Sequence, residues 1–136
     1  MTVVLNDTVR KLLGAPNPGV LATLNPDGSP QTSVVWVTLD GDDVLVSTEA
    51  GRRKDLNVRA DGRVSLTVYD TANHYSYVEL RGRATVTEDA GRAVTARIAD
   101  EYAGPGAGQE YLDLPPENVR VIIRITPERV SGNAAR

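Results

Sequence analysis

The sequence predicts a mostly β domain with short helices, built as a small antiparallel barrel of six strands. Three observations support this prediction. Short segments alternate apolar and polar residues, tight turn sequences separate them, and helical spacing occurs only in brief stretches between them. Closure into a barrel removes the exposed edges that such short strands would otherwise present. An open sheet covered by a helix is the alternative arrangement.

Length and composition limit the classes of protein to consider. The 136 residues correspond to a single domain, 1–136, and 40% hydrophobic residues are enough for a core. The absence of cysteine excludes disulfides and thiol chemistry, and a lone histidine makes a histidine metal site or a Ser/His triad a poor hypothesis. A net charge of −3 and few aromatic residues argue against a nucleic-acid partner. With no targeting pattern at the start and no long apolar run, we expect a cytoplasmic protein without a membrane partner.

The first half of the chain is expected to form one helix and then three strands. Asn6 or Asp7 can cap a helix that stops at Gly14. Turn sequences rich in Asn, Asp and Gly then separate segments of high β propensity. These strands are expected at residues 19–24, 31–39 and 44–48.

The second half is expected to alternate helices and strands. Leu56 and Ala60 are spaced for one face of a short helix, and apolar residues every four positions predict a longer one later. Gly82 marks a bulge or bend within a long strand. The expected helices cover residues 52–60 and 88–102, the strands 63–70, 75–87 and 119–126, and a loop 103–118. That loop either closes over a pocket or merely joins helix to strand.

The segment from Ser47 to Asn57 carries the best local signal for binding chemistry. It runs from the end of a predicted strand into the first turn of a predicted helix, where backbone N–H groups are free. Arg52 offers a planar fork to phosphate oxygens, and Lys54 offers a point charge. The segment therefore indicates a phosphate site, although a solvated basic corner is the alternative. No Walker or dinucleotide glycine pattern is present.

Five sequence blocks occur in an order that is typical of one superfamily. They cover residues 19–24, 27–31, 52–61, 75–78 and 120–127. With this order the chain resembles the flavin- or deazaflavin-binding split β-barrel proteins, the superfamily of pyridoxamine 5′-phosphate oxidase, and within it the small branch that depends on the deazaflavin F420. The resemblance implies a split barrel of the FMN-binding type. It also implies a homodimer with the cofactor at the subunit interface.

The resemblance also assigns site residues. In such proteins the basic positions at the strand-to-helix turn hold the cofactor phosphate, the second strand lines the ring system, and the end of the next strand lies between them. The cofactor-binding positions carried over are Gln31, Ser33, Val35, Ser47, Thr48, Arg52, Lys54 and Asn57. Trp36 and Tyr77 are expected at the substrate pocket. A register error of one residue would replace Ser33 and Val35 by Thr32, Val34 and Trp36. No catalytic acid and no metal ligand is nominated.

The function implied is an F420-dependent oxidoreductase that transfers a hydride between F420 and an unsaturated small-molecule substrate. Positive charge at Arg53, Arg59 and Arg63 favours F420, whose tail is acidic, over FMN. Some of these arginines are also expected to pair with Asp55 and Asp61. The alternatives are an FMN-binding protein like pyridoxamine 5′-phosphate oxidase and a non-catalytic cofactor carrier.

Overall fold

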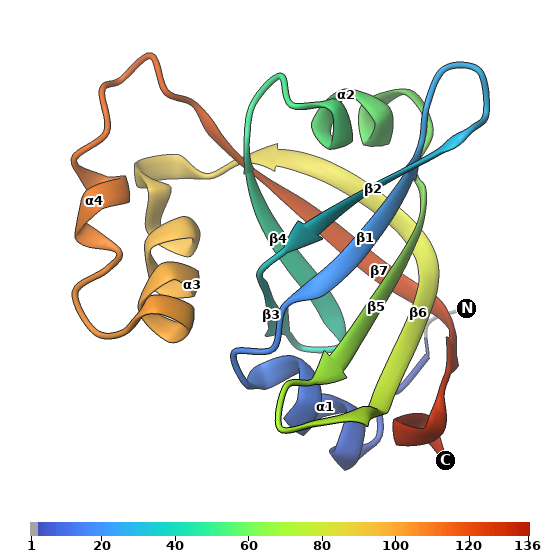
Figure 1. The fold of residues 1–136 in the computed structure, drawn as a ribbon. Coiled ribbons are helices and arrows are strands. Elements are labelled where there is room, and N and C mark those ends of the chain that lie inside the picture. Colours follow the sequence, from blue (N-terminus) through green and yellow to red (C-terminus); the bar gives the residue numbers. More distant parts are fainter. Residues whose placement is uncertain (1–2) are drawn as a thin grey trace.

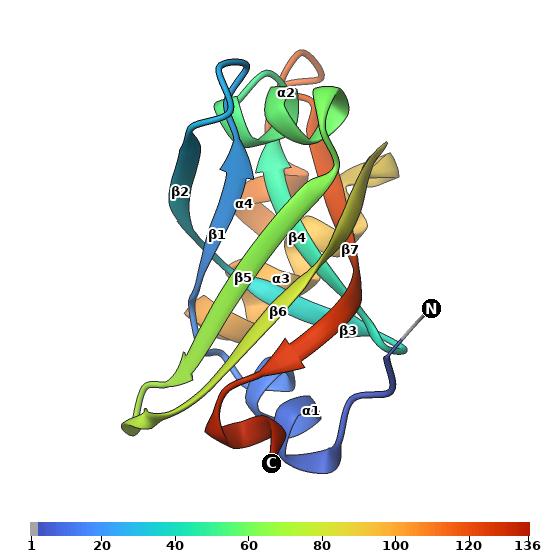
Figure 2. The same ribbon diagram turned by 90° about the vertical axis from the view of Figure 1, so that its right-hand side faces the viewer.

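A single antiparallel sheet curls around the core of the protein, as Figures 1 and 2 show. The computed structural model describes residues 3–136, and within them the sheet has seven strands in the order β2-β1-β5-β6-β7-β4-β3. The strands at its two edges, β2 and β3, follow one another in the chain. The mostly β fold with short helices is confirmed. The strands are β1 (Gly19–Leu24), β2 (Pro30–Val35), β3 (Val37–Asp40), β4 (Asp43–Glu49), β5 (Arg63–Asp70), β6 (Asn73–Glu88) and β7 (Arg120–Ser131).

The strand predicted over residues 31–39 is two strands, which explains why seven are found where six were expected. The first part, β2, pairs with β1, and the second part, β3, pairs with β4. Because the two parts of this segment form the opposite edges of the sheet, the strand breaks between them, at Trp36. Val35 and Val37 on either side are both buried, so the apolar alternation continues across the break and does not reveal it in the sequence.

Short helices close the two ends of the barrel (Figure 1). They are α1 (Asp7–Gly14) at one end and α2 (Arg53–Ala60) at the other, while α3 (Ala93–Ala103) and α4 (Gln109–Leu112) stand beside the barrel. Helix α1 starts where predicted, since the Asn6 side chain accepts a hydrogen bond from the Val9 N–H at 2.8 Å. It buries Val9, Leu12 and Leu13 against the core.

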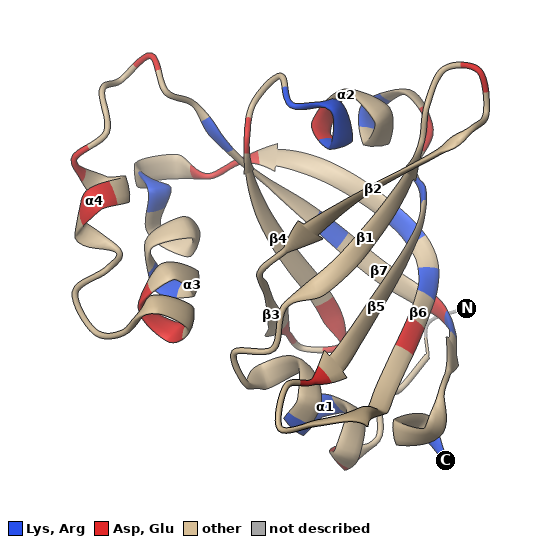
Figure 3. Ribbon diagram, in the orientation of Figure 1, with Lys and Arg blue, Asp and Glu red and all other residues tan. Residues whose placement is uncertain are grey.

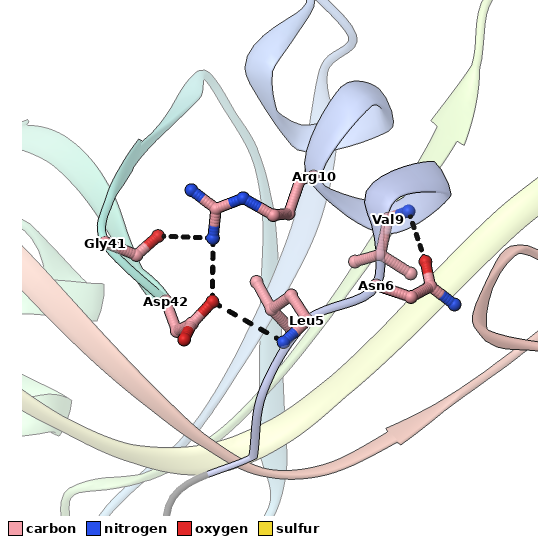
Figure 4. Close-up of polar contacts among 6 residues, drawn as sticks. All are labelled: Leu5, Asn6, Val9, Arg10, Gly41 and Asp42. Atoms are coloured by element: carbon pink, nitrogen blue, oxygen red, sulfur yellow. Dashed lines mark hydrogen bonds and ion pairs between the residues drawn. The ribbon is translucent and has the colours of Figure 1, made fainter.

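The β3–β4 turn fastens α1 to the barrel, as Figure 4 shows. Arg10 Nη1 lies 2.7 Å from Asp42 Oδ1 and 2.9 Å from the Gly41 carbonyl oxygen. The same carboxylate oxygen of Asp42 accepts a long hydrogen bond, 3.4 Å, from the Leu5 backbone N–H. Arg10 of the helix and Asp42 of the turn therefore fix the position of α1 across the end of the barrel.

Three features of the second half differ from the sequence prediction. Regular helix begins at Ala93 instead of 88, because Gly91 and Arg92 both have positive φ, 66° and 56°. The loop 103–118 contains α4 and the final strand runs on to Ser131. The bend at Gly82 is confirmed, since the pairing of β6 with β7 shifts there.

Side chains fill the interior of the barrel. Large, fully buried side chains from strands around the sheet fill it, among them Leu21, Leu66, Leu80, Ile123 and Ile125. A filled interior leaves a sizeable ligand to bind on the outside. Within residues 3–136, no helix has the length and apolar character needed to cross a membrane.

Candidate functional site

A cleft of about 280 Å³ opens on the outside of the barrel, between the end of β4 and the α3–α4 segment. The β2–β3 break forms its apolar side with Val34, Val35 and Trp36, and Ile98 of α3 adds to that surface. The remaining lining is polar: Ser47, Thr48 and Glu49 of β4, Arg52 and Lys54 of the turn and α2, and Thr95, Tyr111 and Arg120. An apolar surface beside a cluster of cations suits a flat ligand that carries negative charge.

The turn from β4 into α2 owes its shape to Gly51 and Asp55. Gly51 has a φ of 90°, a conformation that side-chain-bearing residues rarely adopt. The buried Asp55 carboxylate accepts a hydrogen bond from the Gly51 N–H at 2.8 Å and pairs with Arg59 Nε at 2.7 Å. With the turn fixed in this way, Arg52 and Lys54 line the cleft.

Positive charge dominates the cleft. Figure 3 shows the basic residues at the start of α2 and at the start of β7. Burial, followed by the nearby charges of Arg52 and Arg120, lowers the pKa of Lys54 below its ordinary value of 10.5. Glu49 is the carboxylate among the lining residues, and its nearest approach to Arg52 Nη2 is 3.4 Å. Cations that repel one another in this way favour the binding of an anion between them.

Hydrogen bonds connect Arg120 at the cleft to a buried carboxylate behind it. Arg120 Nη2 donates to Ser47 Oγ at 3.0 Å, and Ser47 Oγ lies 2.6 Å from Thr95 Oγ1. Thr95 Oγ1 donates to Asp89 Oδ2 at 2.7 Å, and the Thr95 N–H donates to the same oxygen at 2.7 Å. The Tyr111 ring covers the guanidinium at 5.3 Å. Four segments of the chain thus fix one arginine in the cleft.

The cleft brings together six of the predicted site residues. They are Val35, Trp36, Ser47, Thr48, Arg52 and Lys54. Val34, from the alternative register, lines the cleft as well.

Four predicted residues lie elsewhere. Gln31 contacts Thr23 Oγ1 at 3.0 Å, and the buried Ser33 hydroxyl has no hydrogen-bond partner among residues 3–136. Asn57 is only 1% exposed and donates to Thr23 and to Asn25, so it fastens α2 to the β1–β2 hairpin. The Tyr77 backbone N–H donates to Asn133 near the C-terminus.

Arg120, Thr95 and Tyr111 line the cleft but were not predicted as site residues. Arg120 begins the last of the five sequence blocks, but that block indicates a strand and carries no binding signal of its own, and Thr95 lies on a helix whose apolar spacing indicates only packing. Tyr111 lies in the loop for which closure over a pocket was one hypothesis. Arg92 fastens this loop, since its guanidinium donates to the Leu114 carbonyl at 2.7 Å and the Asn118 carbonyl at 3.0 Å.

The two ion pairs expected beside the site are present. Arg59 pairs with Asp55, and Arg63 pairs with Asp61 at 2.7 Å. The guanidinium of Arg63, first through its hydrogen bond, holds the pKa of Asp61 at about 2. Because carboxylates balance Arg59 and Arg63, these arginines add less to the positive potential than a count of charges indicates.

One family model and several solved structures match the chain. A family model described as pyridoxamine 5′-phosphate oxidase matches residues 5–134. A solved structure of an F420 reductase is 34% identical, covers 90% of this chain and 94% of that chain, and has a TM-score of 0.77. A conserved hypothetical protein of Mycobacterium tuberculosis is 26% identical over 95% of this chain and 84% of that chain, with a TM-score of 0.76. General stress protein 26 of Bacillus anthracis shares the fold, with a TM-score of 0.67. It is 18% identical, and the match covers 91% of this chain and 89% of that chain.

Proposed function

The chain belongs to the pyridoxamine 5′-phosphate oxidase family, and we propose that it is an oxidoreductase that uses F420 to reduce an unsaturated small molecule. The cations at the β4–α2 turn are the observation that carries this proposal. Arg52 and Lys54 line one cleft with an exposed aromatic residue, Trp36. The 34% identity to a protein described as an F420 reductase supports the choice of cofactor. FMN is the second candidate, since the same cations suit its phosphate.

The donors of the cleft fit a phosphate-bearing cofactor better than a metal ion. Arg and Lys bind phosphate oxygens, and the buried Nε of Arg120 has no hydrogen-bond partner among the described residues. Residues 3–136 contain no group of three His, Cys, Asp or Glu side chains placed to hold a metal. Arg52 and Lys54 would hold the phosphate, and the apolar surface around Trp36 would face the ring system.

The cofactor, when bound, supplies the hydride chemistry, and the residues of this chain bind, orient and shield it. Arg52 and Lys54 fix the anionic end, while Val35, Trp36 and Ile98 exclude water from the apolar side. The lining contains no histidine, and its one carboxylate, Glu49, lies beside Arg52. The protein therefore contributes orientation and electrostatic stabilisation, and the proton that completes the reduction of the substrate comes from water or from a hydroxyl near the substrate.

We propose that the active form is a homodimer with the cofactor at the interface. The outer face of β1, β2, β5 and β6 exposes apolar side chains at paired register positions. Val20 lies opposite Val34, Tyr69 lies opposite Tyr77, and these four side chains are 38–72% exposed. Val34 also lines the cleft, so a partner on this face would border the cofactor site.

Cofactor titrations test the proposed function. The fluorescence of Trp36, the only tryptophan, reports on the cleft directly. We expect saturable quenching by F420 at one site per subunit, and consumption of reduced F420 when an unsaturated test substrate is added. Tighter binding of FMN than of F420 would indicate an FMN-dependent protein. Tight binding of F420 without consumption of its reduced form would indicate a cofactor carrier. Binding of neither cofactor contradicts the proposal.

Sedimentation equilibrium tests the dimer. Val20→Asp places a charge in the middle of the apolar face and should shift the protein to monomers. Val4→Asp is the matched control, because Val4 is 82% exposed and lies outside that face. A wild-type protein that sediments as a monomer at all concentrations contradicts the dimer.

A further inference from the structure

We propose that Arg120 provides a second anion-binding position in the cleft, which takes a carboxylate or phosphate group other than the phosphate held by Arg52 and Lys54. The inference depends on the proposed function only for the identity of the cofactor. The second anion belongs either to the acidic side chain of the cofactor or to an acidic substrate.

The direction of the hydrogen bonds around Arg120 supports this inference. Asp89 is 7% exposed, and its Oδ2 accepts from both the N–H and the hydroxyl of Thr95. Because the Thr95 proton is given to Asp89, the short Ser47–Thr95 contact uses the Ser47 proton. Ser47 Oγ in turn accepts from Arg120 Nη2. Every donor in the series therefore points from Arg120 toward the buried carboxylate.

This arrangement changes the role expected for Ser47. Its only proton is committed to Thr95, so it has no donor to offer to an anion in the cleft. Ser47, Thr95 and Asp89 are positioning residues for Arg120. They hold the side chain in place through a single hydrogen bond at Nη2, while the negative charge of Asp89 acts from a distance and forms no ion pair with the guanidinium.

The guanidinium itself keeps donors for a ligand. No carboxylate oxygen of residues 3–136 lies within 4.0 Å of it, in contrast to Arg59, Arg63 and Arg124, which all form ion pairs. Its Nε is buried without a hydrogen-bond partner among these residues. A half-buried arginine with an unpaired donor binds an oxyanion favourably, because the desolvation of the arginine has already occurred on folding.

The chain offers a matched set of variants. Arg120→Gln removes the charge, Lys54→Gln removes the charge of the first site, and the double variant combines them. Arg129→Gln is the control, because Arg129 is exposed on the same strand and does not line the cleft. The probes are F420, titrated alone, and benzoate, titrated alone and with saturating F420, all followed by Trp36 fluorescence.

We expect Arg120→Gln to weaken the binding of one probe by about ten- to a hundredfold, the range for a hydrogen bond to a charged group, and Arg129→Gln to change neither. Loss of F420 affinity that adds to the loss from Lys54→Gln assigns the second anion to the cofactor. Loss of benzoate affinity with unchanged F420 affinity assigns it to the substrate. Unchanged binding of both probes, or F420 losses that do not add, overturns the inference.

Two further results separate the inference from its neighbours. Thr95→Val should weaken binding of the same probe as Arg120→Gln, but by a smaller factor. Thr95→Ser keeps the hydroxyl and should bind that probe as the wild type does. Equal effects of the two Thr95 variants would contradict the positioning role. A protein that binds benzoate through Arg120 but binds neither F420 nor FMN rejects the proposed function and leaves the second anion position standing. A protein that binds neither cofactor nor benzoate rejects both.

Discussion

Trp36 stacks on Tyr102, with the ring centroids 5.0 Å apart and the ring planes inclined by 11°. The contact joins the break between β2 and β3 to helix α3. The Tyr102 hydroxyl adds to it, accepting from the Val37 N–H at 2.9 Å and lying 2.8 Å from the Asn17 carbonyl oxygen. One side chain of α3 therefore supports both the strand break and the indole that lines the cleft.

Tyr102→Phe should separate these two contributions. The variant keeps the ring but leaves the Val37 N–H without its partner, and we expect the free energy of unfolding to fall by about 1 to 3 kcal/mol. Urea unfolding measures this loss. Because the stacking persists, the fluorescence spectrum of Trp36 in the folded protein should match that of the wild type. A stability equal to that of the wild type would show that the hydroxyl does not support the break.

Local sequence signals were sufficient for most of the fold. The Asn6 cap, the turn sequences and the alternation of apolar residues placed the helices and strands near their observed positions. The strand break at Trp36 was missed because it depends on which strands the two halves join, and the burial pattern is the same in either case. The later start of α3 was missed because Arg92 adopts a left-handed conformation that only the surrounding loop contacts explain.

The site was predictable where it is contiguous in the sequence. Arg52 and Lys54 lie on one turn, and both line the cleft. Arg120 reaches the cleft because β7 pairs with β4, a relationship between residues far apart in the chain. Asn57 is expected at the site from its proximity to Lys54, but its side chain is 1% exposed and bonds to Thr23 and Asn25, contacts between distant parts of the chain that no local pattern shows.

Gly82 should tolerate no side chain. A Cβ at this position would lie 2.1 Å from the Thr126 carbonyl oxygen, and backbone atoms cannot easily move away. We expect Gly82→Ala to destabilise the protein by about 1 to 3 kcal/mol or more, the cost of overpacking, as measured by thermal unfolding. Gly14→Ala is the control, because nothing lies within 4 Å of its Cβ position and it ends a helix. A normal melting temperature for Gly82→Ala would contradict the close approach of β6 and β7.

Substitution of Lys54 should affect cofactor affinity, whereas substitution of Asn57 should affect stability. Lys54→Ala should weaken cofactor binding by about 1.5 to 3 kcal/mol and leave thermal unfolding of the apo protein nearly unchanged. Asn57→Ala should do the reverse, since it removes the hydrogen bonds to Thr23 and Asn25 and does not touch the cleft. Calorimetry of unfolding and of binding measures both variants. If Asn57→Ala lost affinity without losing stability, Asn57 would belong to the site after all.

Cofactor affinity should depend on pH through Lys54. Its pKa in the free protein is lowered, chiefly by burial and then by Arg52 and Arg120, so it loses its proton at a lower pH than an ordinary lysine. A bound phosphate favours the charged form and raises this pKa, and binding therefore takes up a proton once the pH exceeds the value in the free protein. Affinity should be constant at lower pH and fall as the pH rises through that value, starting below 10.5.

The variant Lys54→Arg isolates this effect. Arginine stays charged throughout the range, so its fall in affinity over the same pH interval should be much smaller. Titration of F420 or FMN at a series of pH values, with thermal unfolding measured at each pH, separates lost binding from lost folding. Folding itself should gain slightly as the pH rises toward 10.5, because the unfolded chain then binds more protons at Lys54 than the folded protein. If cofactor affinity depended on pH in the same way in the wild type and in Lys54→Arg, the charge of Lys54 would not contribute to cofactor binding.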